Sequence, residues 1–81
     1  MNLIGATMDR MNGGDHAVVA GLKAEPRLRR RLLDIGLVPG AHVDCVQVSP
    51  LGDPKAYLIR GAVIALRMCY AATVWIEKRR Q

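Results

Sequence analysis

Residues 42–67 read HVDCVQVSPLGDPKAYLIRGAVIALR, and this stretch indicates how the chain folds. Three short runs rich in Val, Ile, Leu and Ala are separated first by a loop with two prolines and then by Gly61. Short apolar runs bounded by Pro and Gly are typical of β-strands joined by turns. We therefore expect three successive strands, at residues 42–49, 55–60 and 62–67.

The stretch before these strands, residues 26–36, has the pattern of an amphipathic α-helix. Pro26 suits the first helical turn, because a backbone N–H at that position has no partner within the helix. Apolar residues recur along one stripe of this helix: Leu28, Leu32 and Ile35, with Leu33 beside them. Gly36 suits the left-handed conformation that ends many helices, and Leu37 can then pack back on the helix. We predict that Leu32 faces the body of the domain.

Two further strands are expected on either side of this central region. Residues 13–22 begin with two glycines and predict a turn followed by a strand, and residues 73–77 form a last apolar run. Five short strands and one helix in 81 residues predict a mainly β fold. The expected architecture is a small, SH3-like, partly open antiparallel barrel with the helix inserted after the first long strand.

The composition limits the classes of protein to which the chain can belong. The chain has the size of one small domain, expected over residues 1–81 with a core at about 13–77 and a basic tail at 78–81. Hydrophobic residues make up 51% and charged residues 23%, which is typical of a globular chain. The two cysteines are too few for a disulfide scaffold, and no apolar run approaches the roughly 20 residues of a membrane span. Because no signal peptide is visible, we expect a cytoplasmic protein that is not inserted in the membrane.

The net charge of +5 is unevenly distributed along the chain. Between Lys23 and Arg31 there are five basic residues and one acidic residue. Such a patch favours nucleic acid, anionic lipid or an acidic protein surface. Arg27, Arg30 and Arg31 occupy the side of the predicted helix opposite its apolar stripe and are the first candidates for partner binding. The alternative is an ordinary solvated helix face.

Two other segments are candidates for partner contact. The two prolines of residues 50–54, which we call the tip loop, fix its shape and lower the ordering cost of binding. Leu51 is the expected exposed anchor of this loop, with Asp53 beside it. Met68 and Tyr70 are expected in a tight turn between the last two strands, where they would form an exposed contact site. In the alternative interpretation, Tyr70 folds back over the end of the barrel and Met68 fills a gap.

Candidate metal ligands are few and lack the spacing of a metal motif. His16, His42 and Cys69 are the weak candidates, because no C-x-x-C or H-x-x-x-H pattern is present. His42 and Asp44 share a strand face and could share an ion, and the last strand could bring Glu77 near His16. The alternative is two solvated imidazoles. Of the two thiols, Cys45 is expected in the core and Cys69 at the surface.

The sequence contains no catalytic constellation. Ser49 is the only serine and lies between Val48 and Pro50, and no G-x-x-x-x-G-K-[ST] phosphate loop is present. A domain of this size also offers little room for a buried active cleft. We therefore expect a protein that is not an enzyme.

Three ordered motifs resemble the FeoA family. Residues 31–40, RLLDIGLVPG, are similar to the family segment RL..LGl.PG. Residues 49–61, SPLGDPKAYLIRG, are similar to the segment sPLGDP.ay..rG, and residues 64–67, IALR, to the segment iaLR. The resemblance covers about residues 13–77 and implies a cytoplasmic SH3-like barrel, related to the C-terminal barrel of iron-dependent repressors. At Met68–Tyr70 this chain departs from the family, which usually has charged residues there.

The same resemblance implies a function in the Feo ferrous iron uptake system. A FeoA protein is expected to be an accessory or regulatory protein that contacts the FeoB permease and its cytosolic G-protein domain. We expect no required cofactor, with a weak Fe(II) or Zn(II) site and a homo-oligomer as secondary alternatives. Two other functions are alternatives: a nucleic-acid-binding small barrel, and a module that binds or senses a transition metal. Nucleic acid is not the expected partner, because three aromatic residues make a poor stacking platform.

Overall fold

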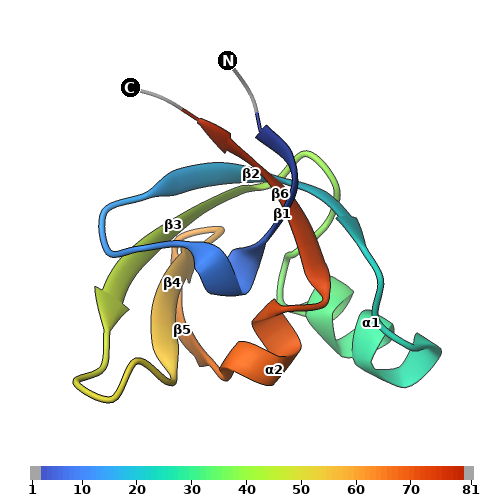
Figure 1. The fold of residues 1–81 in the computed structure, drawn as a ribbon. Coiled ribbons are helices and arrows are strands. Elements are labelled where there is room, and N and C mark those ends of the chain that lie inside the picture. The colour runs from blue at the N-terminus through green and yellow to red at the C-terminus, as the bar shows by residue number, and fades with distance from the viewer. Residues whose placement is uncertain (1–2, 80–81) are drawn as a thin grey trace.

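The computed structural model of the protein describes residues 3–79 (Figure 1). Over this range, six strands form one antiparallel sheet in the order β1-β6-β2-β3-β4-β5. The elements in chain order are β1 (Leu3–Thr7), the 3₁₀ helix η1 (Met8–Arg10), β2 (His16–Leu22), α1 (Pro26–Asp34), β3 (His42–Val48), β4 (Lys55–Ile59), β5 (Ala62–Leu66), α2 (Met68–Ala71) and β6 (Val74–Arg79).

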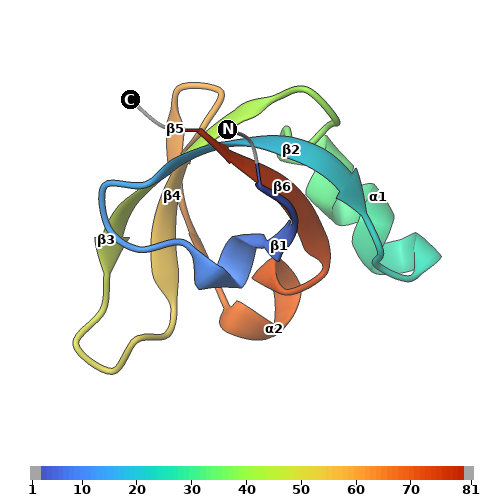
Figure 2. The same cartoon turned by 45° about the horizontal axis from the view of Figure 1, so that its top comes forward.

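The sheet curls into a barrel that does not close. β1 and β5 are its two outer strands, and each is hydrogen-bonded on one side only, β1 to β6 and β5 to β4. α1 follows β2, the first long strand, and lies near α2 at the same side of the barrel (Figures 1 and 2). The predicted fold class, a mainly β and partly open barrel with one inserted helix, is confirmed. Neither α1 nor α2, the α-helices of the described range, has the length and apolar character that a bilayer crossing demands.

Three elements, β1, η1 and α2, go beyond the sequence prediction. β1 pairs with β6 from Leu3 to Thr7, with an irregularity in register before Ala6. A short N-terminal segment with a glycine has little strand pattern of its own, so it forms a strand only because β6 offers it an edge. The helix α2 replaces the predicted tight turn between the last two strands.

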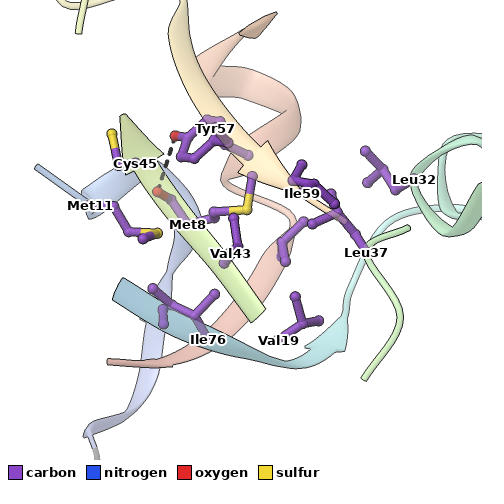
Figure 3. Packing of buried hydrophobic residues seen from close by; sticks show 13 residues of the cluster. Met8, Met11, Val19, Leu32, Leu37, Val43, Cys45, Tyr57, Ile59 and Ile76 are labelled. Atoms are coloured by element: carbon purple, nitrogen blue, oxygen red, sulfur yellow. Dashed lines mark hydrogen bonds between the residues drawn. The ribbon is translucent and has the colours of Figure 1, made fainter. Parts of the chain in front are cut away.

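The core fills the inside of the curled sheet, and Figure 3 shows its centre. Its fully buried members come from both halves of the chain: Met8, Met11, Val19, Leu37, Val43, Cys45, Tyr57, Ile59, Val74 and Ile76. The predicted core boundary at residue 13 is wrong, because Met8 and Met11 precede it. Flexible methionines fill irregular gaps well, and here they close the barrel end below β1. The buried Tyr57 hydroxyl donates a hydrogen bond to the Met8 carbonyl at 3.2 Å.

The helix α1 begins and ends as its sequence predicts. Pro26 is its first residue, and a Glu25 carboxylate oxygen accepts a hydrogen bond from the Leu28 backbone N–H at 2.8 Å. Gly36 has a φ of 108° and follows the last turn. The Leu37 N–H then donates to the Leu32 carbonyl at 3.0 Å, the bond that defines a Schellman motif. Leu32 and Leu37 are both buried, so this helix end is fixed to the barrel.

The predicted basic tail at 78–81 is wrong in its first half. Lys78 and Arg79 belong to β6, and the Lys78 ammonium lies 3.0 Å from the Asp15 carboxylate. Asp15 also accepts a hydrogen bond from the Asn12 backbone N–H at 2.7 Å. These two contacts, the backbone bond first, lower the pKa of the Asp15 carboxyl. The rest of the predicted tail, residues 80–81, lies outside the described residues.

Candidate functional site

A groove between α1, β5 and α2 is the site that the fold builds from predicted binding residues. We call it the helix groove; it has a volume of about 200 Å³ and is lined by Leu28, Arg31, Leu32, Ile35, Ile64, Leu66 and Tyr70. The groove exists because α1 is fixed to the barrel mainly by Leu32, which is 2% exposed. Leu28 and Ile35, one turn to either side of Leu32, are only partly covered. Their apolar surface is therefore offered to the groove.

The rim of the helix groove is basic. A second hollow shares Leu28, Arg31 and Tyr70 with it and extends along α1 to Arg27 and Arg30. All three arginines are exposed, and the two ion pairs found within residues 3–79 involve none of them. The predicted basic face of α1 therefore lies directly beside an apolar hollow.

Two other charged side chains of this helix region are engaged within the chain. Arg29 donates a hydrogen bond to the Leu22 carbonyl at 3.2 Å. Glu25 also lines the second hollow, but its carboxylate holds the first turn of α1. The rim consequently keeps a net positive charge, which favours an acidic partner surface.

Met68 and Tyr70 lie in the short helix α2 rather than in the predicted tight turn. Both stay partly exposed, Met68 at 43% and Tyr70 at 42%, as a contact site requires. Tyr70 also forms one wall of the helix groove. A carboxylate oxygen of Asp53 accepts a hydrogen bond from the Met68 backbone N–H at 2.8 Å. Asp53 therefore has a partner in the chain itself, at the start of α2.

The tip loop presents Leu51 as predicted. Leu51 is 94% exposed, the highest value among the large hydrophobic residues of the described range. The loop is held in shape from within, because the Gly52 N–H donates to the Ser49 carbonyl at 2.8 Å. The tip loop connects β3 to β4 at the opposite end of these strands from the Arg60–Gly61 turn (Figure 1). A binding role for Leu51 remains a prediction.

His16 has a side-chain partner that the sequence analysis did not name. β2 pairs with β3 so that His16 lies opposite Asp44, and the His16 Nδ1 is 2.8 Å from the Asp44 carboxylate. Asp44 is thereby bound to His16 rather than left to share an ion with His42. Glu77 lies opposite Val18, two residues along β2 from His16. Within residues 3–79, no group of three or more His, Cys, Asp or Glu side chains could hold a metal ion.

The two cysteines occupy the predicted environments. Cys45 is buried in the core, where loss of hydration raises the pKa of its thiol. Cys69 is exposed on α2, next to Met68 and Tyr70. A buried thiol with a raised pKa is a poor nucleophile, so Cys45 acts as a packing residue.

Sequence reasoning missed the strand side of the helix groove. Ile64 and Leu66 alternate along β5 and line the groove, a role that the sequence analysis did not assign to them. They line the groove together with Leu28 and Ile35 of α1. Local pattern carries no signal for this arrangement, since it depends on where α1 lies relative to β5.

The family-model comparison matches the FeoA domain over residues 6–78. The chain belongs to the FeoA family. This domain is a small accessory domain of Feo iron transport and is not a known enzyme family. A curated relative from Porphyromonas gingivalis, the Fe(2+) transport protein A/Fe(2+) transporter FeoB fusion protein, is 33% identical over 70 residues. The match takes in 86% of this chain and 8% of the fusion protein, so the chain spans a small part of that relative's length.

Solved structures of FeoA proteins have the same fold. The FeoA protein of Chlorobium tepidum is 34% identical, with a TM-score of 0.83 over 90% of this chain and 70% of that chain. FeoA of Stenotrophomonas maltophilia, described as a prokaryotic SH3 domain protein complexed with zinc, is 27% identical, with a TM-score of 0.80 over 95% of this chain and 100% of that chain. A manganese-dependent transcriptional repressor shares the fold alone, at 20% identity and a TM-score of 0.82 over 91% of this chain and 36% of that chain. The FeoA resemblance is confirmed, and the repressor shows that the same fold occurs in a protein of another kind.

Proposed function

We propose that this chain is a non-enzymatic, cytoplasmic accessory protein of ferrous iron uptake. It acts by binding the cytosolic G-protein domain of a FeoB-type permease. The observation that carries the proposal is the Porphyromonas gingivalis relative, in which a FeoA segment and a FeoB transporter are one chain. A fusion keeps two modules at high effective concentration, which is useful when the separate modules have to meet. Where the two modules are separate chains, binding between them would replace the covalent link.

The helix groove supplies the chemistry for such a contact. Its floor is apolar and its rim carries Arg27, Arg30 and Arg31, while Tyr70 forms a wall. Interfaces are enriched in Arg, Tyr and Met, and their strongest contacts combine a dry apolar centre with a polar rim. An apolar segment with acidic neighbours fits this arrangement. The exposed Leu51 of the tip loop is a second, separate contact candidate.

The residue types at the groove support binding rather than catalysis or base stacking. Arginine and aliphatic side chains position a partner but do not exchange protons near neutral pH. Of the aromatic residues, Tyr57 is buried, and the Lys23 ammonium lies 4.5 Å from the ring centre of Trp75. A stacking platform for single-stranded nucleic acid needs several open aromatic faces. This arrangement favours a protein partner.

The direct experiment is calorimetric titration of the chain with the G-protein domain of the FeoB-type permease from the same cell. The test variant combines Arg27→Gln, Arg30→Gln and Arg31→Gln, and Arg10→Gln is the matched control, because Arg10 is exposed on η1. We expect the triple variant to bind about tenfold more weakly or worse, and the control to bind like the wild type. No binding by the wild-type chain at concentrations of about 100 μM would contradict the proposal.

Weak metal binding is a second candidate function, supported by the His16–Asp44 contact. The S. maltophilia relative was crystallised with zinc. An imidazole and a carboxylate are both zinc ligands, and two of them would leave the remaining positions to water. Zinc should bind with a dissociation constant in the range of about 10–100 μM, and His16→Gln should abolish the binding. A titration with no heat change in the wild type would remove this candidate.

A further inference from the structure

The strand β5 ends the sheet with an unpaired edge. It pairs with β4 through a two-residue turn, Arg60–Gly61, whose φ angles of 50° and 83° are both positive, as in a type I′ hairpin. The two residues that flank such a turn, Ile59 and Ala62, exchange their backbone hydrogen bonds. Bonded and non-bonded pairs then alternate along an antiparallel ladder. The N–H and C=O groups of Val63 and Ala65 therefore point away from β4.

This edge lacks the usual protection against strand pairing. Sheet edges are normally blunted by a lysine, a proline, a bulge or a covering element. The sequence of β5 is Ala-Val-Ile-Ala-Leu, and its pairing with β4 runs without an irregularity. Val63 is 65% exposed, and within residues 3–79 no hydrogen bond is found for the backbone of Val63 or Ala65 beyond the ladder. Four backbone groups are thus available to an incoming strand.

The helix groove lies where a strand added to β5 would place its side chains. Ile64 and Leu66 face the groove from β5, while Leu28 and Ile35 face it from α1. A new strand about 4.8 Å beyond β5 would continue the same alternation of side chains. Every second side chain of that strand would enter the groove. The others would lie beside Val63 and Ala65 on the outer face.

We propose that β5 and the helix groove together bind an extended segment of a partner protein by strand addition. The segment has apolar side chains at alternate positions and acidic residues at its ends. Backbone pairing supplies affinity, and the groove selects the side chains, as in other cases of strand addition. This proposal adds a binding mode to the proposed function. It rests on the proposed function only for the identity of the protein that carries the segment.

Charge complementarity favours a different protein over a second copy of this chain as the bound partner. Arg60 precedes β5, Arg67 follows it, and Arg31 lines the groove, so both ends of the binding line are basic. A second copy of the chain would pair its own β5 antiparallel to this one. In the register centred on Ile64, each Arg67 would then lie beside the Arg60–Gly61 turn of the other copy. Like charges placed together disfavour this pairing, whereas acidic ends on a different partner are attracted.

The test uses proline at the edge, where it removes one free N–H and no ladder bond. Proline is tolerated in an edge strand when its missing N–H faces solvent, so Val63→Pro should keep the fold. Val63→Thr is the matched control, because it changes the side chain but keeps the N–H. Circular dichroism and thermal melting establish that both variants fold. The probe is a library of random dodecapeptides displayed on phage and selected on the wild-type chain.

We expect the selected peptides to alternate apolar residues between acidic ends. Val63→Pro should bind a selected synthetic peptide about tenfold more weakly, and Val63→Thr within about twofold of the wild type. Methylating the peptide's own backbone nitrogens should weaken binding at every second position only, a readout that needs no protein variant. In nuclear magnetic resonance, the amide protons of Val63 and Ala65 should become protected from exchange.

Three results would overturn the proposal. The first is a selection that yields no such peptide, and the second is a Val63→Pro variant that binds the selected peptide as tightly as the wild type does. The third is a wild-type dimer in sedimentation that Val63→Pro dissociates, because the bound strand would then come from a second copy of the chain. The permease titration separates this proposal from the proposed function. If the permease domain binds Val63→Pro as it binds the wild type, the function stands and strand addition fails. If peptides bind along β5 but the permease domain does not bind, strand addition stands and the proposed function fails.

Discussion

Two regions of the barrel treat their apolar residues in opposite ways. At the end closed by η1, Met8 and Met11 are fully buried, and the Lys55 ammonium donates hydrogen bonds to the carbonyls of Asp9 and Met11, both at 2.7 Å. We call this the sealed end. At the helix groove, by contrast, Leu28 and Ile35 are only partly covered, and the adjoining Tyr70 is 42% exposed. The chain can therefore bury apolar side chains completely. Because it leaves those of the helix groove partly uncovered, we interpret the groove as a binding surface.

The largest expected effect comes from the sealed end. Met8→Ala should lower the free energy of unfolding by about 3–5 kcal/mol, because the residue is fully buried and its removal leaves a cavity. Met68→Ala, at a residue that is 43% exposed, should cost less than about 1 kcal/mol. Urea unfolding of both variants measures the contrast. Similar losses in the two variants would mean that the buried Met8 contributes no more to stability than the half-exposed Met68.

Leu32→Ala should have the next largest effect, about 2–3 kcal/mol, the lower part of the range for a buried leucine. The residue is buried, but it also borders the helix groove, so neighbouring side chains and water can relax into the space. Thermal melting with a Leu28→Ala control, at a partly covered position of the same helix, measures the difference. An unchanged melting temperature for Leu32→Ala would show that α1 is not anchored by this residue.

Tyr57→Phe isolates the hydrogen bond that the buried Tyr57 ring makes at the sealed end. The variant keeps the buried ring but loses the hydrogen bond from the hydroxyl to the Met8 carbonyl. We expect a loss of about 1 kcal/mol in unfolding free energy, because the carbonyl loses its side-chain donor in an apolar environment. The check is chemical denaturation at constant temperature. A variant as stable as the wild type would mean that this bond does not hold η1 to β4.

The ionisation of Asp15 makes the free energy of unfolding depend on pH. Its pKa is lower in the folded chain than its ordinary value of 3.8, because the carboxylate accepts the Asn12 N–H and lies beside Lys78. A lowered pKa means that the stabilisation is complete above about pH 4 and is lost as the pH falls through the folded-state pKa. The contact is partly exposed to solvent, so Asp15→Asn should cost less than about 1 kcal/mol at pH 7. The variant should also unfold with a shallower acid dependence; an identical dependence would contradict the assignment.

The smallest effect on stability is expected at Leu51. Because the side chain is 94% exposed, Leu51→Asp should leave the melting temperature within about 1 °C of the wild type. If the tip loop is a contact surface, the same variant should bind the permease domain several-fold more weakly. Melting and titration of one protein preparation give both values. A variant that unfolds would show that Leu51 stabilises the loop, and unchanged binding would remove it from the interface.

Sequence reasoning succeeded where the signal is local. The start and end of α1 depend on Pro26 and Gly36, and the exposure of Leu51 depends on the prolines around it. These features were predicted because short segments determine them.

It failed where distant segments decide the outcome. β1 becomes a strand only because β6 pairs with it, and Met8 becomes core only because η1 closes the barrel. His16 meets Asp44 through the register between β2 and β3, which no local pattern reveals. The helix groove is of the same kind, since it joins residues of α1 to residues of β5 and α2.

The measurement that tests the central claim most directly is chemical-shift mapping of the isotope-labelled chain with the permease's G-protein domain. We predict that the largest amide and methyl shifts fall on Leu28, Ile35, Ile64 and Tyr70, around the helix groove. Signals from Met8 and Met11 at the sealed end should stay in place. Shifts concentrated at the sealed end, with the groove unaffected, would contradict the account.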